Sequence, residues 1–155
     1  MVPELGDLFE SGVSILVGTR DAALVPEAMR GCGAVVHADR QHVTVFVPTI
    51  VAERTLANIR DNGQVAVCFS RQIDHRTMQI KGRVREVREA AAEERDVVMR
   101  YHGALTDGLA MIGMQRSTLK PWNAWPATAV EVEVEKIFSQ TPGPNAGEPW
   151  TGGRT

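Results

Sequence analysis

The segment VEVEVE at residues 130–135 alternates strictly between valine and glutamate. Successive side chains of a β-strand point to opposite faces of a sheet, so this period of two predicts a strand with one apolar and one polar face. A similar alternation occurs in HVTVFV at residues 42–47, which Pro48 ends, and in VAVCF at residues 65–69. These three segments predict a mainly β fold.

The remaining chain adds further strands and three short helices to this pattern. Gly31 and Gly33 interrupt one expected strand and predict a bend that lets the sheet curl. Strands are also expected at residues 13–19, 26–37 and 75–88, and helices at 3–12, 49–61 and 90–102. Strands that outnumber helices favour an antiparallel β-barrel with short helices over a doubly wound sheet.

The length and composition narrow the possible functions. A chain of 155 residues fits one domain, expected over residues 1–139, with a Gly/Pro-rich tail at 140–155. Its 17 basic and 19 acidic side chains disfavour nucleic acid as a partner. The acidic first ten residues lack a secretion pattern, and no apolar run reaches the roughly 20 residues of a membrane span, so a cytoplasmic protein without a membrane partner is expected.

Motifs for other chemistries are missing from the sequence. The four histidines show no metal-ligand spacing with each other or with Cys32 and Cys68, so no metal site is expected. The sequence contains neither a Gly-x-Ser-x-Gly elbow nor a phosphate loop, which disfavours hydrolase and kinase chemistry.

Several short motifs follow one another in an order that points to a known family. They are Val17-Gly18-Thr19, Pro26-x-x-x-Arg30, Val43–Pro48, Glu53-Arg54-Thr55-x-x-Asn58-Ile59-Arg60, Val65–Phe69 and Met78–Gly82. This succession, over about residues 8–90, resembles the FMN-binding split barrels related to pyridoxamine 5'-phosphate oxidase. The resemblance implies a six-stranded antiparallel split barrel that binds FMN between two identical subunits.

The resemblance also implies a phosphate site at the start of the helix at residues 49–61. Helix amino termini favour anions, and Arg54 and the Thr55 hydroxyl would contribute there. Similar proteins often carry lysine at the position of Thr55, and this departure leaves Arg54 and Arg30 to supply charge. Arg30 stands one position past the usual strand arginine, so a bulge at Gly31 must re-aim it.

Two more groups complete the expected cofactor site. Thr77, Gln79 and Lys81 share one face of a strand that, in this family, runs along the cofactor. The backbone around Val47, Pro48 and Thr49 is expected at the edge of the flavin ring. Each of these features also has an explanation that involves no cofactor. Arg54 can lie on a solvated helix face, and the polar face of residues 75–88 can be the outside of an antiparallel sheet.

The resemblance therefore predicts an FMN-dependent oxidoreductase that passes electrons from a reduced nicotinamide to an unknown small-molecule acceptor. No catalytic residue is assigned, because the cofactor carries the chemistry. Alternatives on the same barrel are an F420-dependent reductase and a non-catalytic flavin- or haem-binding module. Oxidation of pyridoxamine phosphate itself is disfavoured, because residues 138–155 lack the basic pattern that such oxidases carry near their end.

Overall fold

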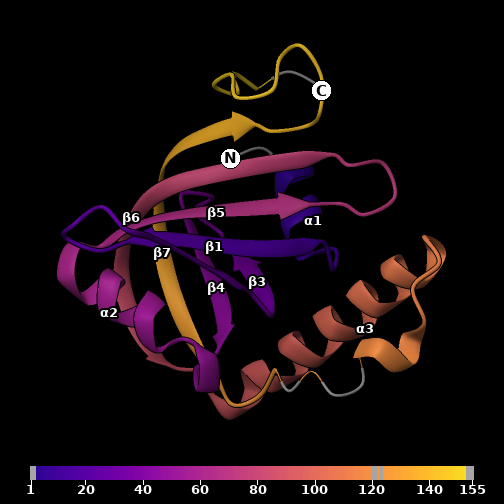
Figure 1. Cartoon of the computed structure of the whole chain (residues 1–155), viewed down its shortest axis with the longest axis horizontal. Coiled ribbons are helices and arrows are strands. Elements are labelled where there is room, and N and C mark those ends of the chain that lie inside the picture. Colours follow the sequence, from indigo (N-terminus) through magenta and orange to yellow (C-terminus); the bar gives the residue numbers. More distant parts are fainter. Residues whose placement is uncertain (1–2, 120–121, 123, 153–155) are drawn as a thin grey trace.

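The computed structural model of the chain describes residues 3–119, 122 and 124–152. It is a curled antiparallel sheet of seven strands, with three α-helices packed around it (Figure 1). The strands are β1 (Ser14–Arg20), β2 (Pro26–Arg30), β3 (Gly33–Val36), β4 (His42–Pro48), β5 (Gln64–Ser70), β6 (Thr77–Glu89) and β7 (Ala127–Ser139). The helices are α1 (Pro3–Glu10), α2 (Glu53–Asn62) and α3 (Arg95–Met111), with 3-10 turns at Thr49–Val51, Ala92–Glu94 and Arg116–Leu119. The prediction of a mainly β split barrel is confirmed.

The sheet curls because one continuous chain segment, residues 26–36, forms both of its edge strands, β2 paired with β1 and β3 paired with β4. The strand order is β2-β1-β5-β6-β7-β4-β3, and β2 and β3 are joined by Gly31 and Cys32 alone. The Gly31 N–H donates to the Ile15 carbonyl of β1 at 3.0 Å, and the Cys32 N–H donates to the Phe46 carbonyl of β4 at 2.7 Å.

This bend corrects the expected strand count, which is seven and not six. The segment predicted as one strand at residues 26–37 forms two, because the chain turns a corner at Gly31. A Cβ atom at Gly31 would lie 2.5 Å from Cγ2 of Ile15, so only glycine lets β2 pass so close to β1. The glycine-based prediction of a bend is therefore confirmed.

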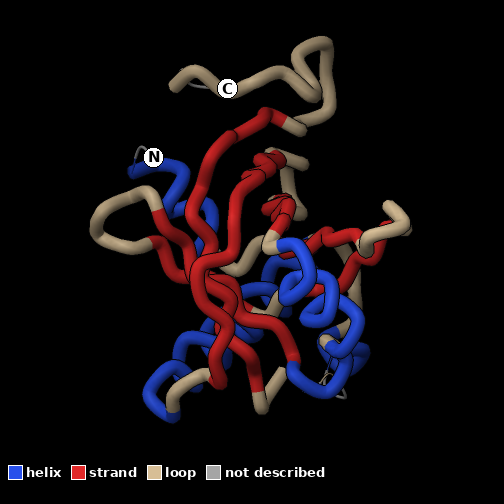
Figure 2. Tube along the Cα trace, turned by 90° about the vertical axis from the view of Figure 1, so that its left-hand side faces the viewer, coloured by secondary structure: helices blue, strands red, loops and turns tan. Residues whose placement is uncertain are grey.

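The core fills the inside of the curled sheet. Alternate residues in part of each central strand point inward, and Val67 of β5, Ile80 of β6 and Val132 of β7 are fully buried. Helix α1 covers one opening, where the Phe9 ring stacks on the Phe69 ring with centroids 3.9 Å apart. Helices α2 and α3 lie at the other end of the sheet from the C-terminal segment (Figure 2).

Helix α3 is longer than its sequence indicates. The expected helix at residues 90–102 begins later and continues to Met111, through Gly103 and Gly108. Tertiary packing outweighs the helix-breaking tendency of the glycines here: Tyr101 and Leu105 are buried, and the Tyr101 hydroxyl donates to the Val13 carbonyl at 2.7 Å. No described helix is both long and apolar enough to cross a membrane.

The chain after β7 turns back and runs beside it. The Ser139 N–H donates to the Glu148 carbonyl at 3.0 Å, and the Trp150 N–H donates to the Ile137 carbonyl at 2.8 Å. These bonds hold the described part of the predicted tail against the outer end of β7, while its residues 153–155 lie outside the described range.

Candidate functional site

A groove of about 550 Å³ lies on the outward face of the sheet, across β1, β5 and β6. Its floor is made by residues with little or no side chain: Gly18 pairs with Ala28 of β2 on one side and with Ala66 of β5 on the other. Residues directly opposite each other in an antiparallel sheet share a face, so these three form a flat strip. The volume falls within the range of small-molecule sites.

Charged side chains surround this strip, and basic ones outnumber acidic ones. Arg20 is held by Gln64, whose Oε1 accepts from Nη2 at 3.1 Å, and Arg83 donates from Nη1 to the Asn62 carbonyl at 3.2 Å. The charged lining residues are Arg20, Lys81, Arg83 and Lys136 against Glu27 and Glu135. The groove therefore presents a small apolar floor within a basic rim.

Strand β6 places two predicted site residues on this outward face. Gln79 and Lys81 point out, while Met78 and Ile80 are fully buried on the inside, as the alternation predicts. Thr77, at the strand's start, is buried, and its hydroxyl donates to the His75 carbonyl at 2.8 Å. Only Lys81 of these three lines the groove.

Arg30 shares the outward face but lies at its far side. It pairs with Leu16 of β1, which pairs with Cys68 of β5, which pairs with Gln79 of β6. Three strand spacings, roughly 14 Å, therefore separate Arg30 from Gln79. Its Nη1 donates to the Ser14 hydroxyl at 3.0 Å.

The residues predicted around α2 are divided between the rim and the interior. Arg54 is 70% exposed, and its Nη1 lies 3.2 Å from Oε2 of the groove residue Glu27, which puts it at the rim. Thr55 is 1% exposed on the buried side of the helix.

The three residues predicted at the ring's edge lie along the β4–β7 pair. Val47 is in the core, Pro48 pairs with Ala127, and the Thr49 hydroxyl is 2.9 Å from that of Thr128. The structure does not bring them to the groove. A cofactor contact by any of the predicted residues stays a prediction.

Sequence reasoning missed the groove residues Arg20, Arg83 and Lys136. Arg83 has a usable signal, because it continues the outward series of Gln79 and Lys81 at a spacing of two. Lys136 has a different sequence signal, because the adjacent charges Glu135 and Lys136 break the Val-Glu alternation. In the structure this break coincides with a β-bulge.

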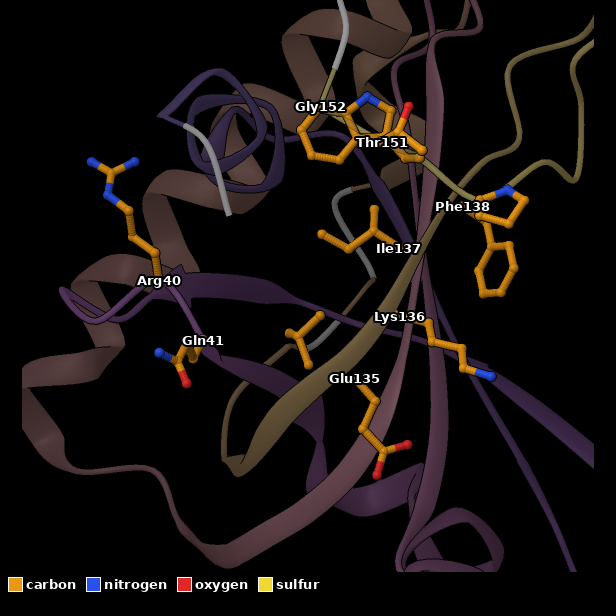
Figure 3. A pocket seen from close by; sticks show the side chains of 11 residues that line it. Arg40, Gln41, Glu135, Lys136, Ile137, Phe138, Thr151 and Gly152 are labelled. Atoms are coloured by element: carbon orange, nitrogen blue, oxygen red, sulfur yellow. The ribbon is translucent and has the colours of Figure 1, made fainter.

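A second cavity, of about 680 Å³, lies where the C-terminal segment meets β7 (Figure 3). Figure 3 shows Ile137 pointing to one side of β7, toward Arg40 and Gln41, and Lys136 and Phe138 pointing to the other. None of the predicted cofactor residues lines this cavity.

The turn between β3 and β4, beside this second cavity, holds a histidine–carboxylate pair. His42 Nδ1 lies 2.6 Å from Asp39 Oδ2, and Asp39 Oδ1 accepts from the Gln41 N–H at 2.8 Å. The Gln41 N–H, followed by the His42 ring, lowers the pKa of Asp39 to about 2, and the bond to Asp39 raises the pKa of His42. Among the described residues, no cluster of histidine, cysteine or carboxylate side chains is arranged to hold a metal ion.

Asp39→Asn is expected to lower the pKa of His42 toward the ordinary histidine value of about 6.5. The raised pKa of His42 stabilises the folded state at low pH, and this stabilisation is lost as the pH rises through the pKa of His42 in the folded state. The lowered pKa of Asp39 stabilises the folded state above about pH 4, and this stabilisation is lost as the pH falls toward 2. The pair therefore contributes most between about pH 4 and 6.5. An NMR titration of the His42 ring in both proteins measures the shift, and identical titration curves would contradict the assigned pair.

No protein-family model and no curated protein matches the sequence. Solved structures do match the fold. HupZ of group A Streptococcus is 22% identical with a TM-score of 0.58, over 95% of this chain and 99% of that one. A proposed pyridoxamine 5'-phosphate oxidase of Lactobacillus delbrueckii is 16% identical with a TM-score of 0.57, over 90% and 93% of the two chains. A protein named F420 reductase is 16% identical with a TM-score of 0.54, over 88% and 98%. The chain therefore has the split-barrel fold of the pyridoxamine 5'-phosphate oxidase-like proteins, as the sequence resemblance predicts.

Proposed function

We propose that this chain is an FMN-binding flavoprotein and that the outward groove of β1, β5 and β6 holds part of the cofactor. The observation that carries the proposal is the combination of a flat floor of Gly18, Ala28 and Ala66 with a basic rim. A planar ring needs a flat apolar surface, and a phosphate needs cationic donors. Both requirements are met on one sheet face.

The chain's own side chains would bind and orient the cofactor. The Gln79 amide, on the outward face next to the groove, offers two N–H donors for the polar edge of a ring, while its Oε1 accepts from Gln140 Nε2 at 3.5 Å. Arg54 at the rim offers charge for a phosphate, since its ion pair with Glu27 leaves the Arg54 side chain 70% exposed. Bound FMN supplies the transfer of electrons, which we propose to run from a reduced nicotinamide to a small-molecule acceptor.

A second copy of the chain is proposed to complete the site. The outward face beside the groove carries Leu16, which is 46% exposed, next to the half-buried Cys68 and Ala66. An apolar strip of this kind is suited to contact between two copies and would exclude water from a ring lying against it. The homodimer is therefore part of the proposal.

The deazaflavin F420 is the second candidate cofactor. The basic rim of Arg20, Lys81, Arg83 and Lys136 favours it, because F420 carries an acidic tail in addition to its ring. One structure of the same fold is named F420 reductase.

Purified protein titrated with FMN, and separately with F420, tests the proposal. We expect FMN to bind with a change in its visible spectrum, and the bound FMN to be reduced by a nicotinamide. Light scattering is expected to give the FMN-bound protein the mass of a dimer. Gln79→Leu is expected to weaken FMN about 3- to 10-fold, the value of one hydrogen bond. Gln115→Leu, on an exposed residue after α3, is the matched control and should leave the affinity unchanged.

The two cofactors give opposite outcomes. Binding of F420 without FMN would replace the first candidate by the second, and a protein that binds neither would contradict the proposed function.

A further inference from the structure

Two lysines lie directly opposite each other on the outward face, at the edge of the groove. Lys81 of β6 pairs with Lys136 of β7 in the register of the sheet, and both are exposed and line the groove. Side chains in such positions have Cβ atoms about 5 Å apart, and like charges there destabilise the strand pair. A pair of this kind is unfavourable unless something negative lies between the two ammonium groups.

The neighbouring carboxylates are occupied by other cations. Glu135 pairs with Arg83 at 3.8 Å, and Glu27 pairs with Arg54 at 3.2 Å. Lys81 Nζ lies 4.9 Å from the centre of the Phe138 ring, which holds the charge but does not neutralise it. Within the part of the chain that the structure describes, Lys136 has no ion pair or hydrogen bond from its ammonium group.

The backbone fixes this arrangement. Between Lys81 and Gly82 the register shifts, so that Lys136 and Val134 oppose consecutive residues of β6 and Glu135 is the extra residue of a bulge. Gly82 permits the close approach, since a Cβ atom there would lie 1.9 Å from the Glu133 carbonyl oxygen. The lysine pair therefore results from a specific backbone feature, and Figure 3 shows Lys136 and Ile137 pointing to opposite sides of β7.

We propose that Lys81 and Lys136 form an anion site that takes a phosphate or carboxylate group of the ligand in this groove. An anion between them converts a repulsive pair into two charge-assisted contacts. The bound anion comes either from the cofactor's own phosphate or from a separate anionic substrate. Only this question of the anion's source rests on the proposed function. The chemistry of the site is the same in both cases.

Pyrophosphate is the probe that tests the site without any flavin. We expect one equivalent to bind the wild-type protein in calorimetry, and Lys81→Gln or Lys136→Gln to weaken binding about tenfold each, as the loss of one charge-assisted bond requires. In the absence of anion, either variant should melt at or above the wild-type temperature, because the repulsion is relieved. Arg100→Gln, on the exposed face of α3, removes the same charge elsewhere and is the matched control.

Chloride at equal ionic strength separates a specific site from screening. Equal weakening by Arg100→Gln, unchanged binding in both lysine variants, or no binding to the wild type would overturn the proposal. Lysine-dependent binding of pyrophosphate by a protein that takes up no FMN or F420 would support the anion site and contradict the proposed function instead.

A comparison of FMN with riboflavin identifies the source of the anion. If Lys136→Gln weakens FMN but not riboflavin, the site holds the cofactor's phosphate. If it weakens pyrophosphate and leaves both flavins unchanged, the site belongs to an anionic substrate. Both results support the lysine pair as the binding group.

Discussion

Gly82→Ala is expected to lower the free energy of unfolding by about 3 kcal/mol or more, at the upper end of what overpacking costs. The added methyl carbon would lie 1.9 Å from the Glu133 carbonyl oxygen and 3.0 Å from its carbonyl carbon. These are backbone atoms of β7, which cannot rotate away as a flexible side chain would. Strand β7 must move, and with it the bulge that sets Lys136 opposite Lys81.

Urea denaturation of Gly82→Ala, Gly103→Ala and the wild type measures this effect. Gly103 lies inside α3, and a Cβ atom there would meet nothing within 4 Å. The same chemical change at Gly103 should therefore raise stability by about 0.5–1 kcal/mol, because alanine is the better helix former. If both variants were as stable as the wild type within about 0.5 kcal/mol, the close approach of β6 and β7 would be wrong.

The strands could be predicted because their alternation matches a sheet with one buried face. Residues 43–47, 65–69 and 130–135 all lie in strands β4, β5 and β7. The helix expected to end at residue 61 ends at Asn62, where Gly63 takes the left-handed conformation with φ of 67°. These features depend on neighbours in the sequence. Local pattern is therefore sufficient for them.

The features that were missed depend on contacts between distant residues. The glycines predict the bend at Gly31 but not the division of one expected strand into two, which arises because the two halves pair with β1 and β4. Helix α3 passes through Gly103 because Tyr101 and Leu105 are anchored against the barrel. Neither partner can be identified from the local sequence.

The candidate site was predicted in part for the same reason. Periodicity alone places Gln79 and Lys81 on one face of β6, which is the outward face in the structure. The break in the Val-Glu alternation marks a bulge at Glu135 and Lys136, but the position of Lys136 opposite Lys81 follows only from the register of β6 against β7. A shift of this size changes which side chains are opposite each other, so the basic rim is a property of the pairing as well as of the sequence.

Phe9→Ala is the second large effect, with an expected loss of about 3–5 kcal/mol in the free energy of unfolding. Phe9 and Phe69 are both fully buried, and their rings stack at 3.9 Å with an angle of 15° between the planes. The contact between the Phe9 and Phe69 rings holds α1 against β5, over the opening of the barrel. Truncation removes the ring's buried surface and leaves a cavity between α1 and β5 that the rigid sheet cannot fill.

Phe138→Ala is the matched control for Phe9→Ala, because it deletes the same ring from the outward face of β7. Phe138 is only half-buried and lies beneath Lys81, so its loss should cost about 1 kcal/mol, in proportion to the smaller area withdrawn from water. Thermal and urea denaturation of both variants give the comparison. Equal losses in the free energy of unfolding would mean that α1 does not close the barrel. The expected difference assigns the stability of the barrel end under α1 to the Phe9–Phe69 stack. The outward face then contributes little to stability and is free to bind a ligand.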